Sequence, residues 1–271
     1  MTPDKVEIPR NAQGRYYHID CRPGDVGRYI LTCGDRNRCR NIASHFDSTE
    51  IVRDNRDFLT ITGRYKGIEI SALCAGIGPA AAAIAMVEIC QCSPEATIIR
   101  VGSCGGLQDH VNAGDLIVTE RALRDEDTTL CYAGPEVEAT ADPDVCAALV
   151  EACRVLGFAY HVGVTCTTSD FYAGQGRVVP GFPTLDPEKV ERMRREGVLN
   201  FEMEMSVFLT LARVSSFNVR AGGVCAVFAE RTRGVFASSE LLQEYEMRCI
   251  QAGLLAVELL DRPDASAKLL P

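Results

Sequence analysis

The sequence predicts an α/β protein, a three-layer α/β/α sandwich around a central twisted sheet that is mostly parallel or mixed. Short β-branched runs alternate with helical patterns through most of the 271 residues. Several of these runs, such as residues 97–103, are apolar on both faces, which is typical of strands covered by helices on each side. No repeat or long Gly/Ser linker interrupts the pattern, so we expect one domain over residues 1–271, with residues 1–17 as an N-terminal extension.

The expected elements follow from local signals in chain order. Short apolar and β-branched runs predict strands at residues 29–33, 69–75, 97–103, 115–122, 161–168, 198–201 and 221–229. Longer periodic or Ala-rich stretches predict helices at residues 36–46, 79–91, 144–156, 187–196, 204–214 and 239–260. Pro79 and Pro187 suit the first turn of a helix. Residues 176–187 are rich in Gly and Pro, which predicts a loop.

The composition is that of an ordinary globular protein with an acidic surplus. Apolar residues make up 46% and charged residues 24%, which argues against a disordered or fibrous chain. The net charge of -9, with no basic cluster, argues against a nucleic-acid partner. Arginine accounts for 24 of the 28 basic residues. Because the guanidinium group suits phosphate and carbonyl oxygens, each arginine in an apolar segment is a candidate for binding.

The thirteen cysteines are interpreted as reduced thiols, since their number is odd and no C-x-x-C pair occurs. Cys90 and Cys92 form a C-x-C pair without a nearby His, so we expect no zinc site. Residues 1–20 lack the apolar core of a signal peptide. The longest uncharged stretch, residues 70–87, is interrupted by glycines and a proline. We therefore expect a cytoplasmic protein without a membrane span.

Ligands of open α/β sheets bind beyond the carboxyl ends of the strands. The first expected strand is followed by GDRNR (residues 34–38), a tight turn into a helix with two arginines in its first turn. Arginines at this position oppose the helix dipole. An anion bound between the helix N-terminus and a guanidinium group would explain them. Two solvated arginines at a surface turn are the alternative.

Residues 76–81 read GIGPAA and match the G-x-G-x-x-A pattern of dinucleotide-binding proteins. Such a site needs an acidic residue at the end of the next strand, but that strand reads IIRVGSCGG (residues 98–106). Arg100 in an apolar strand, followed by Ser103 and paired glycines, suits a bare phosphate better than a dinucleotide. A structural ion pair is the alternative role for Arg100.

Two further segments carry polar side chains after strands. In SDFYAGQGR (residues 169–177), an aromatic ring, an amide and a guanidinium group can stack on a flat heterocycle and bind its carbonyl and N–H groups. An ordinary Phe-Tyr core anchor is the alternative. In the run Glu202-Met203-Glu204, one carboxylate can accept hydrogen bonds from two vicinal hydroxyls, and the other would be structural or solvated.

Taken in order, GDRNR, CAGIGPA, IIRVGSCGG, SDFYAGQGR and NFEMEMSVF resemble the nucleoside phosphorylase family, and within it the uridine phosphorylases of the pyrimidine branch. No single motif is specific, but the five in order are, and the similarity runs from about residue 18 to residue 260. It implies the nucleoside phosphorylase fold. It also implies reversible phosphorolysis of uridine, and of 2′-deoxyuridine as a further substrate, to uracil and (deoxy)ribose 1-phosphate in pyrimidine salvage.

The resemblance implies three sets of binding residues. In the order phosphate, ribose and base, they are Gly34, Arg38, Arg56, Arg100 and Ser103; His18, Met203 and Glu204; and Phe171, Gln175, Arg177, Glu202 and Arg231. His18 and Arg56 would reach the site of a neighbouring subunit. We therefore expect a homodimer with shared sites, or a higher oligomer, and no activity in a monomer. Phosphate is the expected co-substrate.

This chain departs from the family pattern at two places. One concerns the choice between purine and pyrimidine substrates, and the other concerns a cation site. Purine-cleaving relatives carry a Ser-Asp pattern where this chain reads AERT (residues 229–232), and residues 176–187 resemble an insert of the pyrimidine branch. Uridine is therefore favoured, although Glu230 could turn inward. Some relatives bind a monovalent cation between subunits, but the matching residues here are Asp57, Ile77 and Ala81. We expect no cofactor, and a cation site near Asp57 lacks the relatives' ligands.

Three alternatives stay open on the sequence alone. A purine nucleoside phosphorylase of the same fold would cleave inosine faster than uridine. A nucleoside hydrolase would release uracil without phosphate. A regulatory protein would bind uridine without turning it over.

Overall fold

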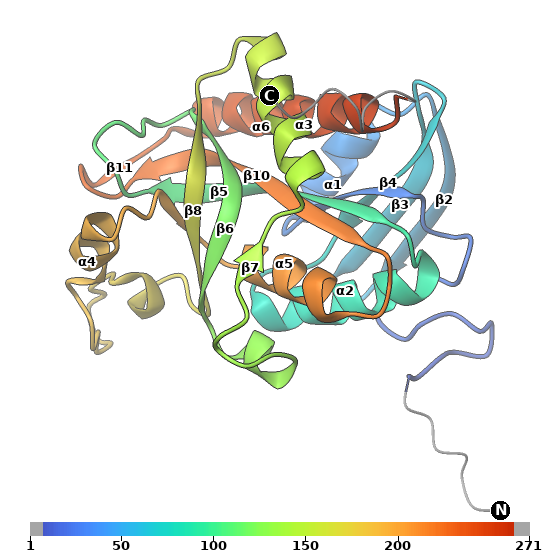
Figure 1. Ribbon diagram of the computed structural model, residues 1–271, viewed down its shortest axis with the longest axis horizontal. Helices are drawn as coiled ribbons and strands as arrows, with labels where there is room; N and C mark the ends of the chain where they lie inside the picture. Colours follow the sequence, from blue (N-terminus) through green and yellow to red (C-terminus); the bar gives the residue numbers. More distant parts are fainter. Residues whose placement is uncertain (1–7, 263–271) are drawn as a thin grey trace, which may run out of the picture.

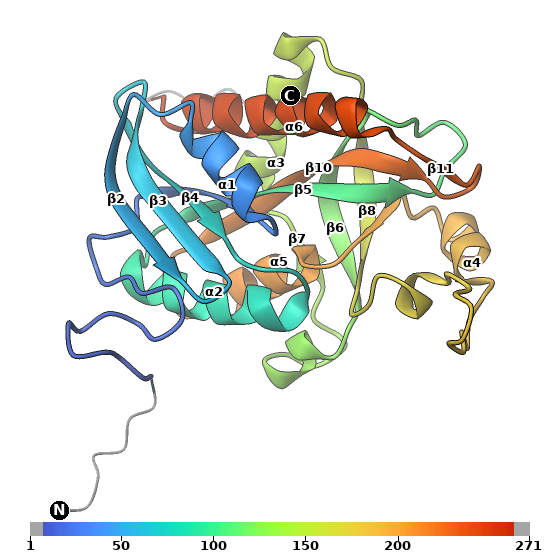
Figure 2. The ribbon, with the colours of Figure 1, turned by 180° about the vertical axis from the view of Figure 1, so that it is seen from behind.

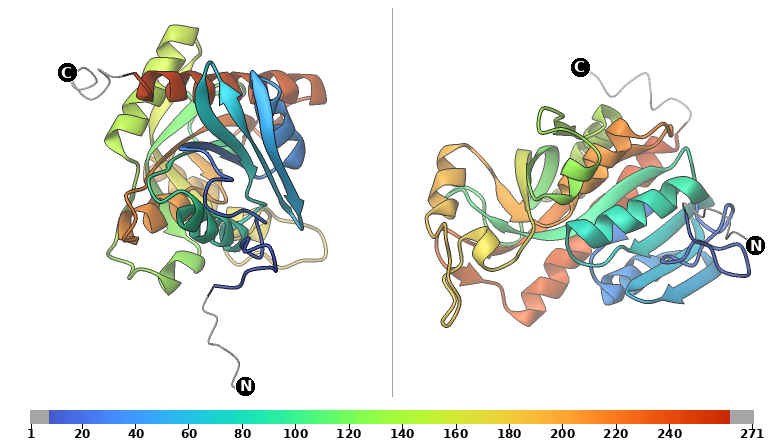
Figure 3. Two further views of the ribbon diagram at one scale, coloured as in Figure 1. Left: turned by 90° about the vertical axis from the view of Figure 1, so that its right-hand side faces the viewer. Right: turned by 90° about the horizontal axis from the view of Figure 1, so that it is seen from below.

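The computed structural model describes residues 8–262, so the first seven residues of the predicted N-terminal extension lie outside the described part. Helices cover both faces of one mixed, 11-stranded sheet (Figures 1 and 2). Figure 3 shows these layers from the side, with α6 in red over one face and α2 in blue-green under the other. The predicted three-layer α/β/α architecture is confirmed. None of the helices within residues 8–262 is long and apolar enough to cross a membrane.

The strands are β1 (Tyr29–Cys33), β2 (Ser48–Asn55), β3 (Phe58–Tyr65), β4 (Ile68–Cys74), β5 (Thr97–Gly106), β6 (Leu116–Asp125), β7 (Ala139–Thr140), β8 (Tyr160–Thr168), β9 (Asn200–Glu202), β10 (Arg220–Glu230) and β11 (Val235–Phe236). The helices are α1 (Arg36–Ala43), α2 (Pro79–Cys92), α3 (Pro143–Leu156), α4 (Lys189–Arg195), α5 (Met205–Val214) and α6 (Ser239–Leu260), with 3-10 turns η1 (Thr128–Cys131) and η2 (Ala173–Gln175).

Each predicted helix and strand is present; β1 and α6 have the predicted bounds, and the others have shifted ends. Helix α1 stops at Ala43 rather than at residue 46, and strand β9 begins at Asn200 rather than at residue 198. The β2–β3 hairpin was not predicted. Strand β2 forms an edge of the sheet and its residues are largely exposed, so its polar sequence carries no apolar run to reveal it.

Strand β5 is the centre of the sheet. It pairs in parallel with β1 on one side and β10 on the other, and its last two residues also pair with β9. Because β10, β6, β8 and β9 are paired in series, the sheet closes back on β5, and β6 and β8 cross β5 steeply in Figure 1. A Cβ at Gly105 would lie 3.0 Å from Cγ of Arg231, so glycine at this position leaves room for the Arg231 side chain.

Two helix starts bring backbone N–H groups to the carboxyl ends of the central strands. Helix α1 begins after Asp35, whose carboxylate accepts a hydrogen bond from the backbone N–H of Arg38 at 2.8 Å. Helix α2 begins at Pro79 after Gly78, which adopts a φ of 92° that favours glycine. Both turns therefore follow directly from their sequences.

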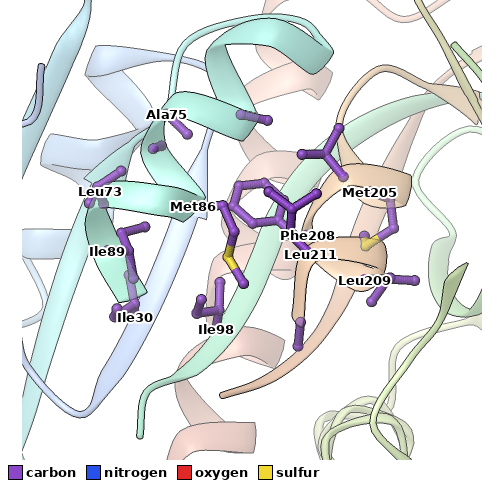
Figure 4. Close-up of a cluster of buried hydrophobic side chains, with 14 of the residues drawn as sticks. Ile30, Leu73, Ala75, Met86, Ile89, Ile98, Met205, Phe208, Leu209 and Leu211 are labelled. Atoms are coloured by element: carbon purple, nitrogen blue, oxygen red, sulfur yellow. The ribbon is translucent and has the colours of Figure 1, made fainter. Parts of the chain in front are cut away.

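The core lies in two layers, one on each face of the sheet. Figure 4 shows the layer between α2, α5 and the sheet, where Met86 and Phe208 pack together against Ile98. The other layer is formed by α1, α3 and α6 against the opposite face, with Leu149 and Ile250 fully buried. Apolar residues on both faces of β5 explain why the sequence predicted a covered sheet.

Phe208→Ala should lower the free energy of unfolding by about 3–5 kcal/mol, because it leaves a cavity under α5 where a side chain only 1% exposed now packs. Urea denaturation monitored by circular dichroism measures the change. Val214→Ala, at the exposed end of the same helix, is the control and should change it by less than about 1 kcal/mol. Equal losses in the two variants would contradict this account of the core.

Candidate functional site

One cavity of about 230 Å³ opens where the carboxyl ends of β1, β5, β9 and β10 meet. Residues predicted from the sequence make up much of its lining: Gly34, Arg38, Arg100, Ser103, Phe171, Gln175, Arg177, Glu202, Met203 and Glu204. These residues come from four separate segments of the chain, and the fold brings them to one place. Three predicted residues, His18, Arg56 and Arg231, do not line it.

Arg38 lies at one end of this cavity, buried in the first turn of α1. Its Nε donates to Oε2 of Glu246 at 2.9 Å, and its Nη1 donates to the carbonyl oxygen of Val101 at 3.3 Å. Burial by itself lowers the pKa of Arg38, but the Glu246 carboxylate outweighs this effect and the pKa is raised. Arg38 therefore stays cationic at the wall of the cavity.

Arg100 lies on β5, at the same end of the cavity as Arg38, and is almost completely buried. Its Nε donates to Oε2 of Glu202 at 3.0 Å, and its Nη2 donates to Oε2 of Glu204. Burial lowers the pKa of Arg100, whereas the charges of Glu204 and Glu202 raise it more strongly. Arg100 therefore forms the structural ion pair that the sequence analysis gave as an alternative, and it also faces the cavity.

The two carboxylates of the Glu-Met-Glu run have different surroundings. Glu202 also accepts hydrogen bonds from the hydroxyl of Thr167 and from the backbone N–H groups of Glu204 and Met205. Its oxygens are thus fully engaged in holding Arg100 and the start of α5. The Oε1 of Glu204 accepts a bond only from the backbone N–H of Gly78 at 2.7 Å. Burial raises the pKa of Glu204, and Arg100 opposes that rise.

Gln175 lines the other end of the cavity, and Arg231 supports it from behind. Gln175 is 3% exposed and donates from Nε2 to the hydroxyl of Thr168 at 3.2 Å. Arg231 lies behind Gln175 and donates to its Oε1 at 3.2 Å and to its carbonyl oxygen at 2.9 Å. Arg231 thus orients the Gln175 amide, which itself faces the cavity.

Arg177 completes this end and stacks on Phe171, with its guanidinium carbon 4.4 Å from the ring centroid. Burial lowers the pKa of Arg177, and burial together with the charge of Arg177 lowers that of Arg231 to about 10. Within residues 8–262, neither arginine pairs with a carboxylate. Two cations therefore lie near each other at this end without an anionic partner.

His18 and Arg56 lie together on the surface, away from the cavity. The ring of His18 contacts Glu88 at 2.7 Å, and Arg56 stacks on Tyr17, at the tip of the β2–β3 hairpin. The side-chain amide of Asn55 donates to the carbonyl oxygen of His18 at 2.8 Å and links the two segments. In one chain, therefore, neither residue reaches the residues that line the cavity.

Several lining residues were not predicted. They are the apolar or small residues Ile77, Cys104, Gly105, Phe201, Phe228, Ala229 and Phe236, together with Asp35. Phe228 is placed by a bulge in β10 between Val227 and Ala229. Apolar residues that line a cavity look like core residues in a sequence, so only the pairing of distant strands identifies them.

Glu230 does not line the cavity. Its Oε1 accepts from the backbone N–H of Ala113 at 2.9 Å, and its Oε2 accepts from Arg233 at 2.7 Å. These two contacts hold the carboxylate toward the loop before β6 rather than toward Gln175. The inward-turned Glu230 considered from the sequence is not observed.

The G-x-G-x-x-A segment uses its backbone to bind Glu204 through Gly78, as described above. Across the described residues, no group of three or more His, Cys, Asp or Glu side chains is arranged to hold a metal ion. Two of the residues that match the relatives' cation site are exposed: Asp57 at the tip of the β2–β3 hairpin, and Ile77, which is 72% exposed.

Comparison with known proteins shows which family this chain belongs to. Residues 28–260 match the family model described as the phosphorylase superfamily. The chain is 43% identical to a uridine phosphorylase of Thermococcus kodakarensis over 86% of this chain and 84% of that one. It is 33% identical to a uridine phosphorylase of Escherichia coli over 87% and 94% of the two chains, and 30% identical to a guanosine phosphorylase of Halorubrum lacusprofundi over 90% and 98%. The chain therefore belongs to the phosphorylase superfamily.

Proposed function

We propose that this protein catalyses the reversible phosphorolysis of uridine, and of 2′-deoxyuridine, to uracil and the corresponding pentose 1-phosphate. The observation that carries the proposal is a cavity with two arginine-containing ends and a buried carboxylate, Glu204, in its lining. One end suits an oxyanion and the other suits an oxygen-rich base. The names of its relatives, which include uridine phosphorylases, support the same reaction.

Phosphate binds at the end formed by Arg38, Arg100, Ser103 and Gly34. Guanidinium groups bind phosphate oxygens through charge-assisted hydrogen bonds. Bound there, phosphate attacks C1′ of the nucleoside, the bond from C1′ to the base nitrogen breaks, and its electron pair leaves with the base. The arginines contribute by holding the nucleophile at reacting distance and orientation.

The ribose lies against Met203 and Glu204. A carboxylate accepts hydrogen bonds from both vicinal hydroxyls, and Glu204 has the freer carboxylate of the two. Glu202 acts indirectly, because its oxygens are engaged by Arg100, Thr167 and the start of α5. Glu202 therefore orients Arg100 rather than binding the base, which is the role that the resemblance implied.

The base binds at the end formed by Phe171, Gln175 and Arg177, with Arg231 behind. Negative charge develops on the uracil oxygens as the base departs, and the amide and guanidinium groups stabilise it. Arg177 and Arg231 have no carboxylate partner among residues 8–262. Their positive charge can therefore stabilise the negative charge that develops on the uracil oxygens. Glu230 faces away, which favours a pyrimidine over a purine that would need a proton donor.

A second copy of the chain completes the site in our proposal. The phosphate end of one chain sets two guanidinium groups against three carboxylates, those of Glu202, Glu204 and Glu246. A phosphate anion needs further positive charge there. Arg56 and His18, which lie together on the surface, are suited to supply it to a partner in a homodimer.

We also propose a cytoplasmic location and no cofactor. Most of the cysteines, Cys131 and Cys146 excepted, are buried as free thiols, which fits a reducing compartment. Burial raises the pKa of Cys90 to about 12 and also raises that of Cys92, so neither thiol is a ready zinc ligand. The reaction requires only phosphate as co-substrate.

The decisive assay measures release of base from uridine, thymidine and inosine, each with and without phosphate. Uracil release from uridine should require phosphate and should exceed release of hypoxanthine from inosine. Equal rates without phosphate would indicate a hydrolase, and faster use of inosine would indicate a purine phosphorylase. Uridine binding without turnover would indicate a regulatory protein, and any of these results would refute the proposal.

Arg100→Ala should lower kcat/KM for uridine by about 100-fold or more, which corresponds to roughly 3 kcal/mol of lost transition-state stabilisation. Steady-state kinetics measures the loss, and circular dichroism checks that the variant folds. Arg220→Ala is the control, because Arg220 pairs with Asp144 at the opposite end of the same strand pair. A tenfold or smaller loss for Arg100→Ala would remove it from the phosphate site.

Gln175→Ala should lower kcat/KM for uridine by about 100-fold and leave the KM for phosphate within about twofold, since the amide binds only the base. Separate titrations of uridine and phosphate measure the two effects. Gln243→Ala, an exposed glutamine on α6, should change neither. If both substrates were affected equally, Gln175 would not be a base-binding residue.

A further inference from the structure

The segment EYEMR (residues 244–248) of α6 is not used in the reaction described above. Glu244 and Arg248 pair with each other at the surface. Tyr245 packs into the core, and a Cβ on Gly114 would lie 2.6 Å from its ring. Glu246 differs from these neighbours, because it reaches across to Arg38 at the wall of the cavity.

Glu246 holds α1 at two points. Its Oε2 accepts from Nε of Arg38 at 2.9 Å, and its Oε1 accepts from Nδ2 of Asn41 at 2.9 Å. The side chains of Arg38 and Glu246 are only 8% and 17% exposed. Because both carboxylate oxygens are engaged by residues one turn apart on α1, the carboxylate has a single orientation toward the guanidinium group.

The contact leaves the outer end of the guanidinium group free for a ligand. Arg38 uses Nε for Glu246 and one hydrogen of Nη1 for the carbonyl oxygen of Val101. Its Nη2 makes no hydrogen bond within residues 8–262. A guanidinium group has five N–H donors, so three remain, all on the terminal nitrogens.

Helix α6, which carries Glu246, packs tightly against the central strands. Cys249, one turn after Glu246, places its thiol 3.5 Å from the carbonyl oxygen of Gly102 on β5 and 3.2 Å from that of Val224 on β10. Ile250 is fully buried, and α6 packs along α3. Figure 2 shows α6 in red passing beside α1 in blue. These contacts anchor the helix that carries Glu246 to the central strands.

We propose that Glu246 is a positioning residue that fixes the guanidinium group of Arg38 with its terminal nitrogens directed at phosphate. The inference rests on the proposed function, since it assigns Glu246 to the phosphate end of that site. A carboxylate so near an anion site opposes anion binding by charge. The position of Glu246 is explained because its alignment of Arg38 favours phosphate binding more than its negative charge opposes it.

Glu246→Ala should raise the KM for phosphate about tenfold or more and leave the KM for uridine within about twofold. Glu246→Gln keeps an acceptor for Nε and should stay within about threefold of the wild type. Glu244→Ala is the matched control, because it removes the same charge from the same helix without contact to Arg38. If Glu246→Ala does not fold, Glu246→Met removes both acceptors with a side chain of similar length and carries the same expectation.

A double-mutant cycle tests whether Glu246 acts through Arg38. In an Arg38→Ala background, Glu246→Ala should cause no further rise in the KM for phosphate. Additive effects would overturn the proposal, as would tighter phosphate binding in Glu246→Ala. Equal losses for uridine and phosphate, or a Glu246→Gln variant as impaired as Glu246→Ala, would indicate a structural or purely electrostatic role and would also overturn it.

The wild-type enzyme separates failure of this inference from failure of the proposed function. Uracil release that does not depend on phosphate in the wild type refutes the proposed function itself. Phosphate-dependent release in the wild type, with an unchanged KM for phosphate in Glu246→Ala, refutes only the role of Glu246.

Discussion

The buried interaction of Arg100 with Glu202 and Glu204 is the constraint on which the rest of the site depends. A buried guanidinium group is costly unless charged partners and hydrogen bonds satisfy it. Glu202 satisfies it while capping the start of α5, and Glu204 does so while accepting a bond from Gly78 at the start of α2. One charged cluster thus ties β5 to the two helices that cover one face of the sheet.

The two ends of the cavity differ in how their arginines are balanced. Arg38 and Arg100 each contact carboxylates, whereas Arg177 and Arg231 contact an aromatic ring, carbonyl oxygens and an amide. Cations without an anionic partner, such as Arg177 and Arg231, act most strongly on negative charge that develops only in a transition state.

Closure of the sheet on β5 is what places these groups together. Because β9 pairs with the last residues of β5, the Glu-Met-Glu run begins beside the strand that carries Arg100 and Ser103. The bulge in β10 then turns Phe228 into the same cavity. By contrast, the β2–β3 hairpin carries Arg56 outward, to the part of the surface where His18 also lies.

The sequence by itself determined the layers of the fold, since apolar faces and capping residues act locally, and it determined the residue types of the cavity through five motifs. It assigned Glu204 to the ribose only through the resemblance and gave Glu202 a role in base binding, because the hydrogen bonds from α5, Thr167 and Gly78 that separate the two carboxylates are not visible in it. Nor could it show that Glu230 faces away or that Glu246 contacts Arg38 across more than 200 residues. Those outcomes depend on which distant strands and helices pack together, and only the tertiary structure decides them.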